Sequence, residues 1–172
     1  MKMNPKHKII TISITILIVA IIIFAGFYYS SHFKIPFEIT DDALRSWKLN
    51  YTIDGEMNEI ALQAYITNGD EWNLLFYKWN YSTIDWNPDF TNYSYAFLYW
   101  GWFPTLSYSI NFTRIFFNDG ILEFHFSTLH PGVADFMVPR DPKQMVQFEN
   151  SQLRNHAVKG YEFIWDSSDI HP

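Results

Sequence analysis

The sequence predicts a mainly β protein: an antiparallel β-sandwich of the immunoglobulin-like or jelly-roll type with one short C-terminal helix, preceded by a single N-terminal transmembrane helix. Three observations lead to this fold class. Apolar and polar residues alternate with a period of two along several segments, turn dipeptides separate these segments, and one uncharged apolar run near the N-terminus is longer than any of them. The alternation is typical of strands with one buried face, and the long run is typical of a helix in a bilayer.

The uncharged run covers residues 9–29. As a helix rising 1.5 Å per residue, these 21 residues would measure about 31 Å, which matches the roughly 30 Å of hydrocarbon in a bilayer. A cleaved signal peptide is the alternative, but its apolar region is only about 7 to 15 residues long and ends at a small-x-small site. Ile23 and Phe24 are too bulky for that site, so we predict an uncleaved signal anchor.

Charges on the two sides of the run predict its orientation. Lys2, Lys6 and Lys8 precede it, and a single lysine, Lys34, follows it closely. By the positive-inside rule the N-terminal tail is cytoplasmic, and the C-terminal domain lies outside the cytoplasm at the cell membrane. That outer part holds nine basic side chains and all 18 acidic ones, so its net charge is −9. An acidic balance argues against a nucleic-acid partner, which would need a basic surface.

The outer domain opens with a predicted three-stranded meander. Residues 47–53 alternate in the strand pattern, Asp54-Gly55 gives a strong hairpin signal, and a return strand covers residues 60–66. Asn68-Gly69-Asp70 is then expected to turn the chain into a third strand over residues 72–79. Each strand therefore pairs with the next along the chain.

Further strands are predicted in the second half of the domain. Residues 93–103 are apolar or aromatic on both faces, as in a central strand that is covered on two sides. Alternation resumes over residues 106–113, and its phase breaks at Arg114-Ile115, which predicts a β-bulge. Asn118-Asp119-Gly120 predicts a hairpin into a strand over residues 122–126.

Near the C-terminus, Asp141-Pro142 has the pattern of a helix N-cap followed by proline at the first helical position, so we expect a short helix over residues 142–154. A last strand is expected over residues 161–165. The predicted organisation is a cytoplasmic tail over 1–8, a signal anchor over 9–29, a short stalk over 30–46, an outer β-sandwich domain over 47–166 and a frayed tail over 167–172.

Aromatic residues make up 20% of the chain and concentrate between Trp72 and Phe117. In a β-sandwich such rings fill the core, contact the membrane or a neighbouring subunit, or stack on sugar rings at an exposed surface. Trp100-Gly101-Trp102 points two tryptophans the same way past a residue without a side chain, which leaves a flat slot. The candidates for a partner or ligand surface are Trp79, Tyr81, Trp86, Trp100 and Trp102.

Four Asn-x-Ser/Thr sequons are candidates for glycosylation, at Asn50, Asn80, Asn92 and Asn111. The alternation puts Asn50 and Asn111 on the polar faces of their strands, where a glycan fits. The alternative is that β-strands naturally alternate aromatic residues with Asn, Ser and Thr. The sequons predict a glycoprotein only in a host that glycosylates its outer proteins.

One candidate metal site is a loop. Asp85, Asn87 and Asp89 have the spacing that begins a calcium loop. Beyond Asp89 the required glycine and bidentate glutamate are missing, because Phe90 and Ala96 stand at those positions. An ordinary Asx-rich turn is the alternative.

A second candidate metal site uses histidines. The chain has no cysteine, which excludes thiolate ligands, disulfides and cysteine nucleophiles. A copper site without thiolate would take His125 and His130 as ligands, with Met137 and a third histidine, His32 or His156, as further donors. The alternative is a solvent-facing strand histidine and an unrelated loop histidine.

No nucleophile elbow, phosphate loop or zinc-helix motif occurs. A carboxylate pair such as Glu123 and Glu162 would act on a glycoside if the two met across a sheet, but nothing in their spacing requires it. We therefore expect no enzyme activity and no cofactor. The leading hypothesis is a non-enzymatic interaction or accessory subunit of a membrane complex or of the cell envelope, bound to a protein partner or to a second copy of the chain. The alternatives are a carbohydrate-binding surface module and a histidine-based metal-binding outer domain.

Overall fold

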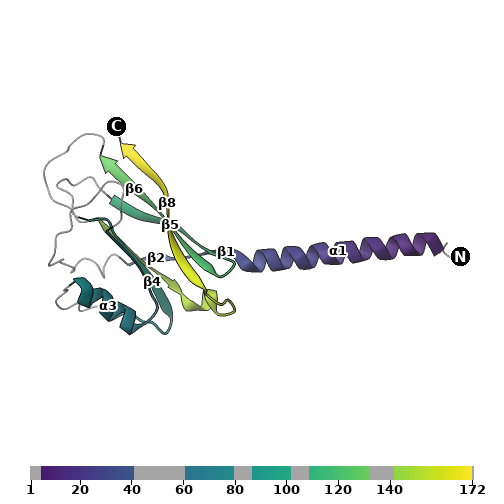
Figure 1. Ribbon diagram of the computed structural model, residues 1–172, viewed down its shortest axis with the longest axis horizontal. Helices are drawn as coiled ribbons and strands as arrows, with labels where there is room; N and C mark the ends of the chain where they lie inside the picture. Colours follow the sequence, from purple (N-terminus) through teal and green to yellow (C-terminus); the bar gives the residue numbers. More distant parts are fainter. Residues whose placement is uncertain (1–4, 41–60, 80–86, 102–108, 132–141, 172) are drawn as a thin grey trace.

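The computed structural model of the protein describes residues 5–40, 61–79, 87–101, 109–131 and 142–171 (Figure 1). Its elements in chain order are α1 (Pro5–Ser31), β1 (His32–Ile35), β2 (Glu38–Ile39), β3 (Leu62–Ile66), α3 (Gly69–Trp79), β4 (Tyr93–Tyr99), β5 (Ser109–Asn118), β6 (Ile121–Pro131), β7 (Lys143–Glu149), the 3-10 helix η1 (Asn150–Leu153) and β8 (Gly160–His171). The mainly β class is confirmed. The strand and hairpin predicted over residues 47–55 lie outside the described residues.

The described strands form two four-stranded sheets. Sheet A has the order β1-β5-β6-β8 and sheet B the order β2-β7-β4-β3. All pairs are antiparallel except β6 and β8, which run parallel, so the prediction of purely antiparallel strands is wrong for sheet A. The reason is that the chain passes through β7 in sheet B before it returns, and β8 therefore starts at the same end of sheet A as β6.

The two sheets share one buried cluster of apolar side chains. Sheet A contributes residues such as Ile115 and Phe124, and sheet B contributes Leu98 and Phe148, all of which are buried. The rings of Phe124 and Phe148 lie 6.1 Å apart across this interface. This contact joins the inner faces of sheets A and B.

Sheet B has a second buried cluster on its other face. Trp72 and Leu75 of α3 pack with Tyr95, Phe97 and other buried side chains of sheet B. The strand β4 lies between β3 and β7, and its residues from position 94 onward are buried whichever face they point to. The predicted central strand, covered on two sides, is confirmed.

The strand predicted over residues 72–79 is wrong, because this segment is the helix α3. Asn68 caps it: its Oδ1 accepts hydrogen bonds from the backbone N–H groups of Asp70 (3.0 Å) and Glu71 (2.9 Å). The Glu71 carboxylate in turn accepts from the Thr67 backbone N–H at 2.6 Å. Asn68 thereby satisfies two free N–H groups of the first turn, and Glu71 fixes the residue before the cap, in an arrangement related to the capping box.

The helix predicted over residues 142–154 is also wrong. Residues 143–149 form β7, and only residues 150–153 form a short 3-10 helix. In β7 Met145 packs in the cluster under α3, while Val146 and Phe148 pack between the sheets. Apolar residues on both faces of a central strand resemble a helical stripe in the sequence, which explains the error.

The predicted hairpin and bulge of sheet A are confirmed. Asp119 (φ 51°) and Gly120 (φ 96°) form the two-residue turn between β5 and β6, and both adopt the left-handed backbone that this turn requires. The pairing of β5 with β6 shifts between Phe112 and Arg114, one position before the predicted phase break. At the C-terminus β8 continues to His171, where the sequence predicted a frayed tail.

The helix α1 runs directly into sheet A (Figure 1). Within the stalk predicted over residues 30–46, residues 32–35 and 38–39 form the short strands β1 and β2, which pair with β5 and β7, and residues 41–46 lie outside the described residues. The backbone N–H of Asp119 donates to the carbonyl of Ser31 at 2.9 Å, and the rings of Tyr28 and His32 stack with centroids 4.4 Å apart. These contacts connect the end of α1 to the tip of the β5–β6 hairpin.

Among the described residues, no helix has both the length and the apolarity to cross a bilayer. The signal anchor over residues 9–29 therefore stays a prediction.

Candidate functional site

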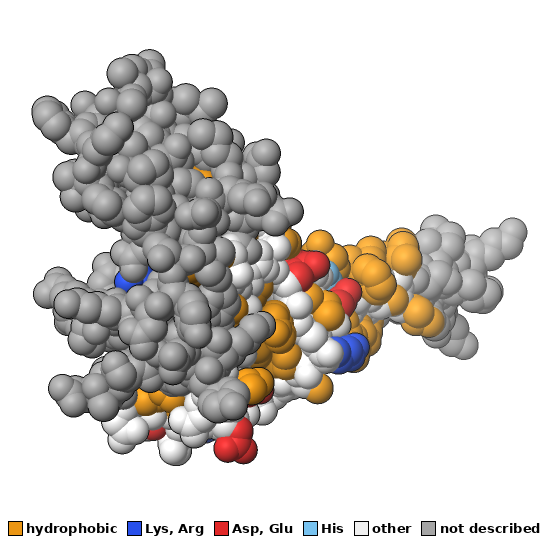
Figure 2. All heavy atoms as spheres, turned by 60° about the vertical axis from the view of Figure 1, so that its left-hand side comes forward, with side chains coloured by type: hydrophobic (Ala, Val, Ile, Leu, Met, Phe, Trp, Pro, Cys, Tyr) orange, Lys and Arg blue, Asp and Glu red, His pale blue; other side chains and the backbone are white. Residues whose placement is uncertain are grey.

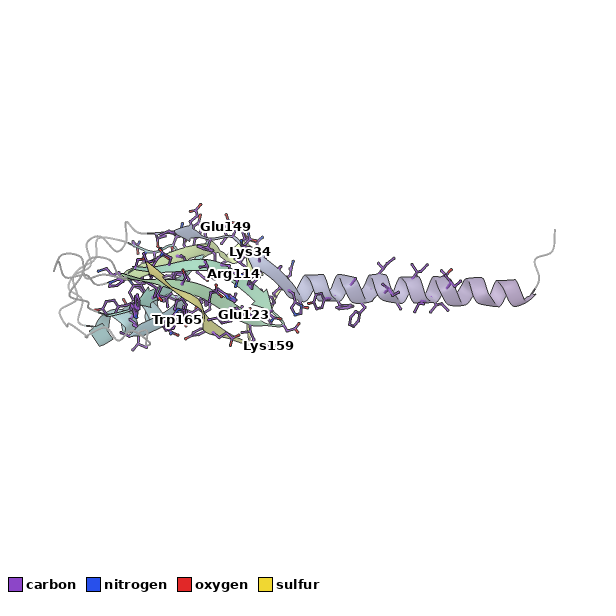
Figure 3. The ribbon with its side chains drawn as sticks, turned by 90° about the horizontal axis from the view of Figure 1, so that it is seen from above. Lys34, Arg114, Glu123, Glu149, Lys159 and Trp165 are labelled. Carbon is purple, nitrogen blue, oxygen red and sulfur yellow. The ribbon has the colours of Figure 1, made fainter. Side chains whose placement is uncertain are left out.

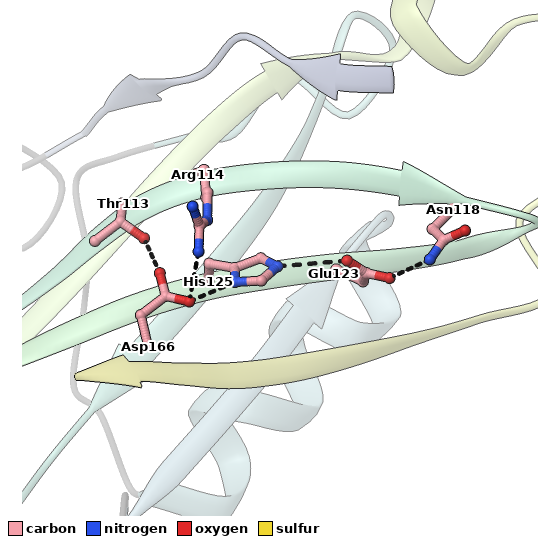
Figure 4. A network of polar contacts seen from close by, with 6 residues as sticks. All are labelled: Thr113, Arg114, Asn118, Glu123, His125 and Asp166. Atoms are coloured by element: carbon pink, nitrogen blue, oxygen red, sulfur yellow. Dashed lines mark hydrogen bonds and ion pairs between the residues drawn. The ribbon is translucent and has the colours of Figure 1, made fainter. Parts of the chain in front are cut away.

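A network of polar side chains lies on the outer face of sheet A, opposite the shared core (Figure 4). The alternation of β6 turns Glu123 and His125 outward while Phe124 points into the core. On β5 the bulge lets two consecutive residues, Thr113 and Arg114, both lie on the exposed side. Asp166 of β8 completes the network from the neighbouring strand.

Asp166 is the centre of this network. Its carboxylate accepts hydrogen bonds from Thr113 Oγ1 at 2.7 Å and from the Arg114 guanidinium at 3.0 Å, and it lies 2.7 Å from His125 Nδ1. Partial burial raises the pKa of Asp166, but the hydrogen bonds from His125, Thr113 and Arg114 and the charge of His125 outweigh it, so the pKa is lowered overall. Asp166 is therefore held as a carboxylate.

His125 lies between two carboxylates. Its Nδ1 faces Asp166, and its Nε2 lies 3.4 Å from Glu123 Oε2. The other oxygen of Glu123 accepts a hydrogen bond from Asn118 Nδ2 at 2.7 Å. Both ring nitrogens therefore face a carboxylate, and the contact with Asp166 joins β6 to β8.

The histidine-based metal site finds no support in the described residues. Among them, no group of three or more His, Asp or Glu residues has the arrangement of a metal site. His32 stacks on Tyr28, and His156 packs against the rings of Phe33 and Phe117. Met137 and the side chain of His130 lie outside the described residues.

The predicted calcium loop contains an Asx turn. Asp89 Oδ1 accepts from the backbone N–H groups of Thr91 (3.1 Å) and Asn92 (3.3 Å), and Oδ2 accepts from Asn92 Nδ2 at 2.7 Å. The side-chain hydrogen bond from Asn92 is the main reason why the pKa of Asp89 is lowered. Asn87 is exposed, and Asp85 lies outside the described residues. The described half of the loop matches the ordinary turn that was the alternative.

Trp100 is fully buried between the sheets, so its ring offers no surface to a sugar. Tyr81, Trp86, Trp102 and the side chain of Trp79 lie outside the described residues. Apart from Trp100, the predicted aromatic surface therefore stays a prediction. Most of the described aromatic residues pack in the two buried clusters instead.

Two of the four sequons fall on described residues. Asn111 is exposed on the outer face of β5, as the sequence predicted. Asn92 is exposed too, but Ser94 of its sequon is buried and donates a hydrogen bond to Asn150 Oδ1 at 2.6 Å. In the folded domain Asn111 is thus the more accessible of these two, and Asn50 and Asn80 lie outside the described residues.

The carboxylates Glu123 and Glu162 lie opposite each other on β6 and β8. Glu123 is engaged by His125 and Asn118, and Glu162 is exposed. Neither carboxylate lines either of the two hollows that the described residues form on sheet B. The pair therefore gives no support to glycoside hydrolysis.

The sequence did not predict a concave region at the end of the β4–β7 pair, where Tyr93 lies opposite Glu149. These two residues line both of two adjoining hollows, of about 430 Å³ and 240 Å³, and we call the whole region the Tyr93 groove. Its walls also include Thr91, Asn92, Ser151 and Arg154 on one side and Phe37, Glu38, Gln147 and Gln152 on the other. The groove depends on the register of β4 and β7, and the sequence predicted β7 as a helix.

These features define a two-sheet β domain carried directly on an N-terminal helix, with a polar network on one sheet and a groove at the end of the other. Comparison of the chain with family models, curated proteins and solved structures gave no match. Its function must therefore be argued from its own geometry.

Proposed function

We propose that this protein is a single-pass, membrane-anchored interaction or accessory subunit without enzyme activity. In this proposal α1 lies in the membrane with its N-terminus in the cytoplasm, and the β domain contacts a membrane complex or the cell envelope on the outside. The two sheets would form a sandwich of the immunoglobulin-like or jelly-roll type, for which the buried cluster shared by their inner faces is the support.

The observation that carries the proposal is the surface of α1. Every side chain from position 14 to 24 is exposed, and large apolar ones such as Ile16 (64%) and Phe24 (75%) are among them. A helix on a globular surface buries one apolar stripe and presents polar residues elsewhere, but residues 16–27 of this helix are apolar all round. Figure 2 shows apolar side chains along its described part. So large an apolar surface needs a cover of lipid or of other helices.

The junction between α1 and sheet A supports an orientation of the domain. Ser31 ends α1 and His32 begins β1, so no flexible linker separates them. His32 Nδ1 lies 3.0 Å from the carbonyl of Tyr28, and its Nε2 lies 3.6 Å from the Asp119 carboxylate. The domain is thereby held at one angle to α1, which suits a subunit that presents a fixed face to a neighbour.

The face we assign to that neighbour is the outer face of sheet A. It carries the exposed side chains of Lys34, Arg114 and Glu162 around the half-buried ring of Phe116, over which the Arg114 guanidinium lies at 5.8 Å. Mixed charge around an aromatic residue and an arginine is typical of non-obligate protein interfaces.

Native mass spectrometry of the full chain, extracted from its own membrane, tests this proposal. We expect a complex with a second protein or a second copy, and we expect Arg114→Glu to weaken it. Lys143→Glu is the matched control, because it makes the same charge reversal on β7 of sheet B, away from both this face and the Tyr93 groove. A protein that is monomeric in every detergent would contradict the proposal, and so would equal effects of the two reversals.

Carbohydrate binding is a second candidate function. The tryptophan slot does not favour it, because Trp100 is buried. The Tyr93 groove favours carbohydrate binding, because it combines an aromatic ring with hydrogen-bonding side chains in one hollow.

A further inference from the structure

The Tyr93 groove has a rigid frame. Asn150 makes three of the hydrogen bonds that fix this frame. Its side-chain N–H donates to the carbonyl of Phe90 at 3.0 Å, and its Oδ1 accepts from the Ser94 hydroxyl. Its backbone N–H donates to the carbonyl of Asn92 at 2.8 Å. These bonds join the Asx turn before β4 to the end of β7. Because the frame is fixed by its own hydrogen bonds, a ligand would meet walls that are already in place.

Several polar groups on the walls have no partner among the described residues. They are the Arg154 guanidinium, the side-chain amide of Gln152 and the hydroxyl of Tyr93. Glu149 accepts a hydrogen bond from Ser151 Oγ at 2.7 Å through Oε2, which leaves Oε1 available. The groove thus offers donors and acceptors on planar side chains next to the half-buried ring of Tyr93.

This combination points to one class of ligand. Planar carboxylate, amide and guanidinium groups can each bond two neighbouring hydroxyl groups, and a tyrosine ring packs against an apolar C–H face. Glu38 and Glu149 in the walls oppose a phosphate or another strong anion, and the polar lining does not suit an apolar ligand. We propose that the Tyr93 groove binds a saccharide through pairs of neighbouring hydroxyl groups, with its ring against Tyr93.

The groove lies towards the end of the domain that is nearest α1. Figure 1 shows η1 and the loop after it turning at that end, and Figure 3 shows Glu149 on the same side as Lys34. If α1 is anchored as we propose above, the groove opens within reach of the membrane surface. The saccharide is then either the headgroup of a glycolipid or part of an envelope polysaccharide, which share this chemistry.

The test uses the full chain in phosphatidylcholine nanodiscs, because sugar-based detergents would compete for the groove. The labelled protein is applied to an array of neutral and N-acetylated oligosaccharides, and a bound structure is then titrated as the free sugar and as a glycolipid in vesicles. We expect at least one oligosaccharide to bind. Tighter binding of the vesicle form would identify a glycolipid headgroup, and equal binding would identify a soluble or wall-bound glycan.

Variants connect the binding to the groove. Arg154→Ala and Gln152→Ala should each weaken it about tenfold or more, because each removes a bidentate contact. Asn155→Ala is the matched control, since Asn155 is exposed nearby but lines neither hollow, and it should change the affinity by less than about twofold. Tyr93→Phe keeps the ring and the fold and should lose only the contribution of the hydroxyl.

If the labelled protein binds no oligosaccharide on the array, the saccharide proposal is wrong. Binding that both Arg154→Ala and Gln152→Ala leave unchanged would overturn it as well. Neither result touches the anchored-subunit proposal, because these variants are expected to keep membrane association and the oligomeric state of the wild type.

Discussion

The two sheets of this protein have four described strands each, but they are covered differently. Sheet B has the shared core on one face and α3 on the other, so its central strand β4 is buried on both sides. Sheet A has the shared core on its inner face, and its outer face carries the polar network of Asp166, His125 and Glu123. The high aromatic content therefore serves mainly to fill two cores, while the polar chemistry lies on sheet A.

The largest effect that tests this contrast comes from an aromatic residue under α3. Phe97 is only 1% exposed in the cluster of sheet B. Phe97→Ala should lower the free energy of unfolding by about 3–5 kcal/mol, because it leaves a cavity. Phe116→Ala, on the outer face of sheet A, should lower it by about 1 kcal/mol or less. Denaturant unfolding of the detergent-solubilised protein measures both changes. Equal losses of unfolding free energy in the two variants would contradict the claim that the outer face of sheet B is buried and that of sheet A is not.

A second change tests the seam between the sheets. The buried Gln144 of β7 accepts a hydrogen bond from the backbone N–H of Phe112, at a point of β5 that β1 does not reach. Gln144→Leu should lower the free energy of unfolding by about 1–3 kcal/mol, because it leaves that N–H buried without an acceptor.

The control for the seam is Gln147→Leu on the same strand. Gln147 is half-buried and bonds only to Glu38 at the surface, so this variant should cost less than about 0.5 kcal/mol. If the two variants were equally stable, the hydrogen bond from the Phe112 backbone N–H to Gln144 would not contribute to stability as we expect.

A smaller effect concerns the helix that covers sheet B. Asn68→Ala removes the acceptor for two N–H groups at the start of α3 and should lower the free energy of unfolding by about 1 kcal/mol. Asn73→Ala, at an exposed position within α3, should be neutral or slightly stabilising, because alanine favours helices. A loss at Asn73 as large as that at Asn68 would argue against the cap.

The smallest effect is the pH dependence of the network on sheet A. The pKa of Asp166 is lowered in the folded protein, so its stabilisation is present above the unfolded pKa near 3.8 and is lost as the pH falls through the lower, folded value. Because Asp166 lies near the surface, Asp166→Asn should cost only about 0.2–1 kcal/mol at pH 6.

As the pH falls below 3.8 and through the lowered pKa of the folded protein, that difference from the wild type should shrink towards zero, since the wild-type carboxyl becomes protonated and resembles the amide. The lowered pKa of Asp89 acts in both proteins and cancels in the comparison. Unfolding curves at pH 6 and at low pH measure the difference in unfolding free energy between the two proteins. A difference that grows as the pH falls would contradict the lowered pKa of Asp166.

The sequence predicted sheet A better than sheet B, for a physical reason. Strands with one exposed face alternate, and local turn chemistry marks their ends, so the bulge on β5 and the turn at Asp119-Gly120 were readable. β7 is covered on both faces, and this pattern does not differ from that of a buried helix. For α3, the capping signal of Asn68 and Glu71 was present in the sequence but was taken for a turn.

The candidate sites were less predictable than the fold. His125 was singled out as a metal ligand, but its carboxylate partner Asp166 comes from a parallel strand 41 residues away along the chain. The Tyr93 groove requires the pairing of Tyr93 with Glu149, which only the register of β4 and β7 creates. Such contacts depend on tertiary pairing, and a local pattern does not encode them.

The central claim is that α1 holds the β domain at a membrane, and alkaline extraction of membranes from cells that express the full chain tests it most directly. We predict that the wild type stays in the membrane pellet and that the double variant Ile16→Lys, Ile22→Lys moves to the supernatant, because two charges within the apolar helix oppose its insertion. The matched variant Ile16→Leu, Ile22→Leu should stay in the pellet. Release of the wild-type chain into the supernatant would contradict the account.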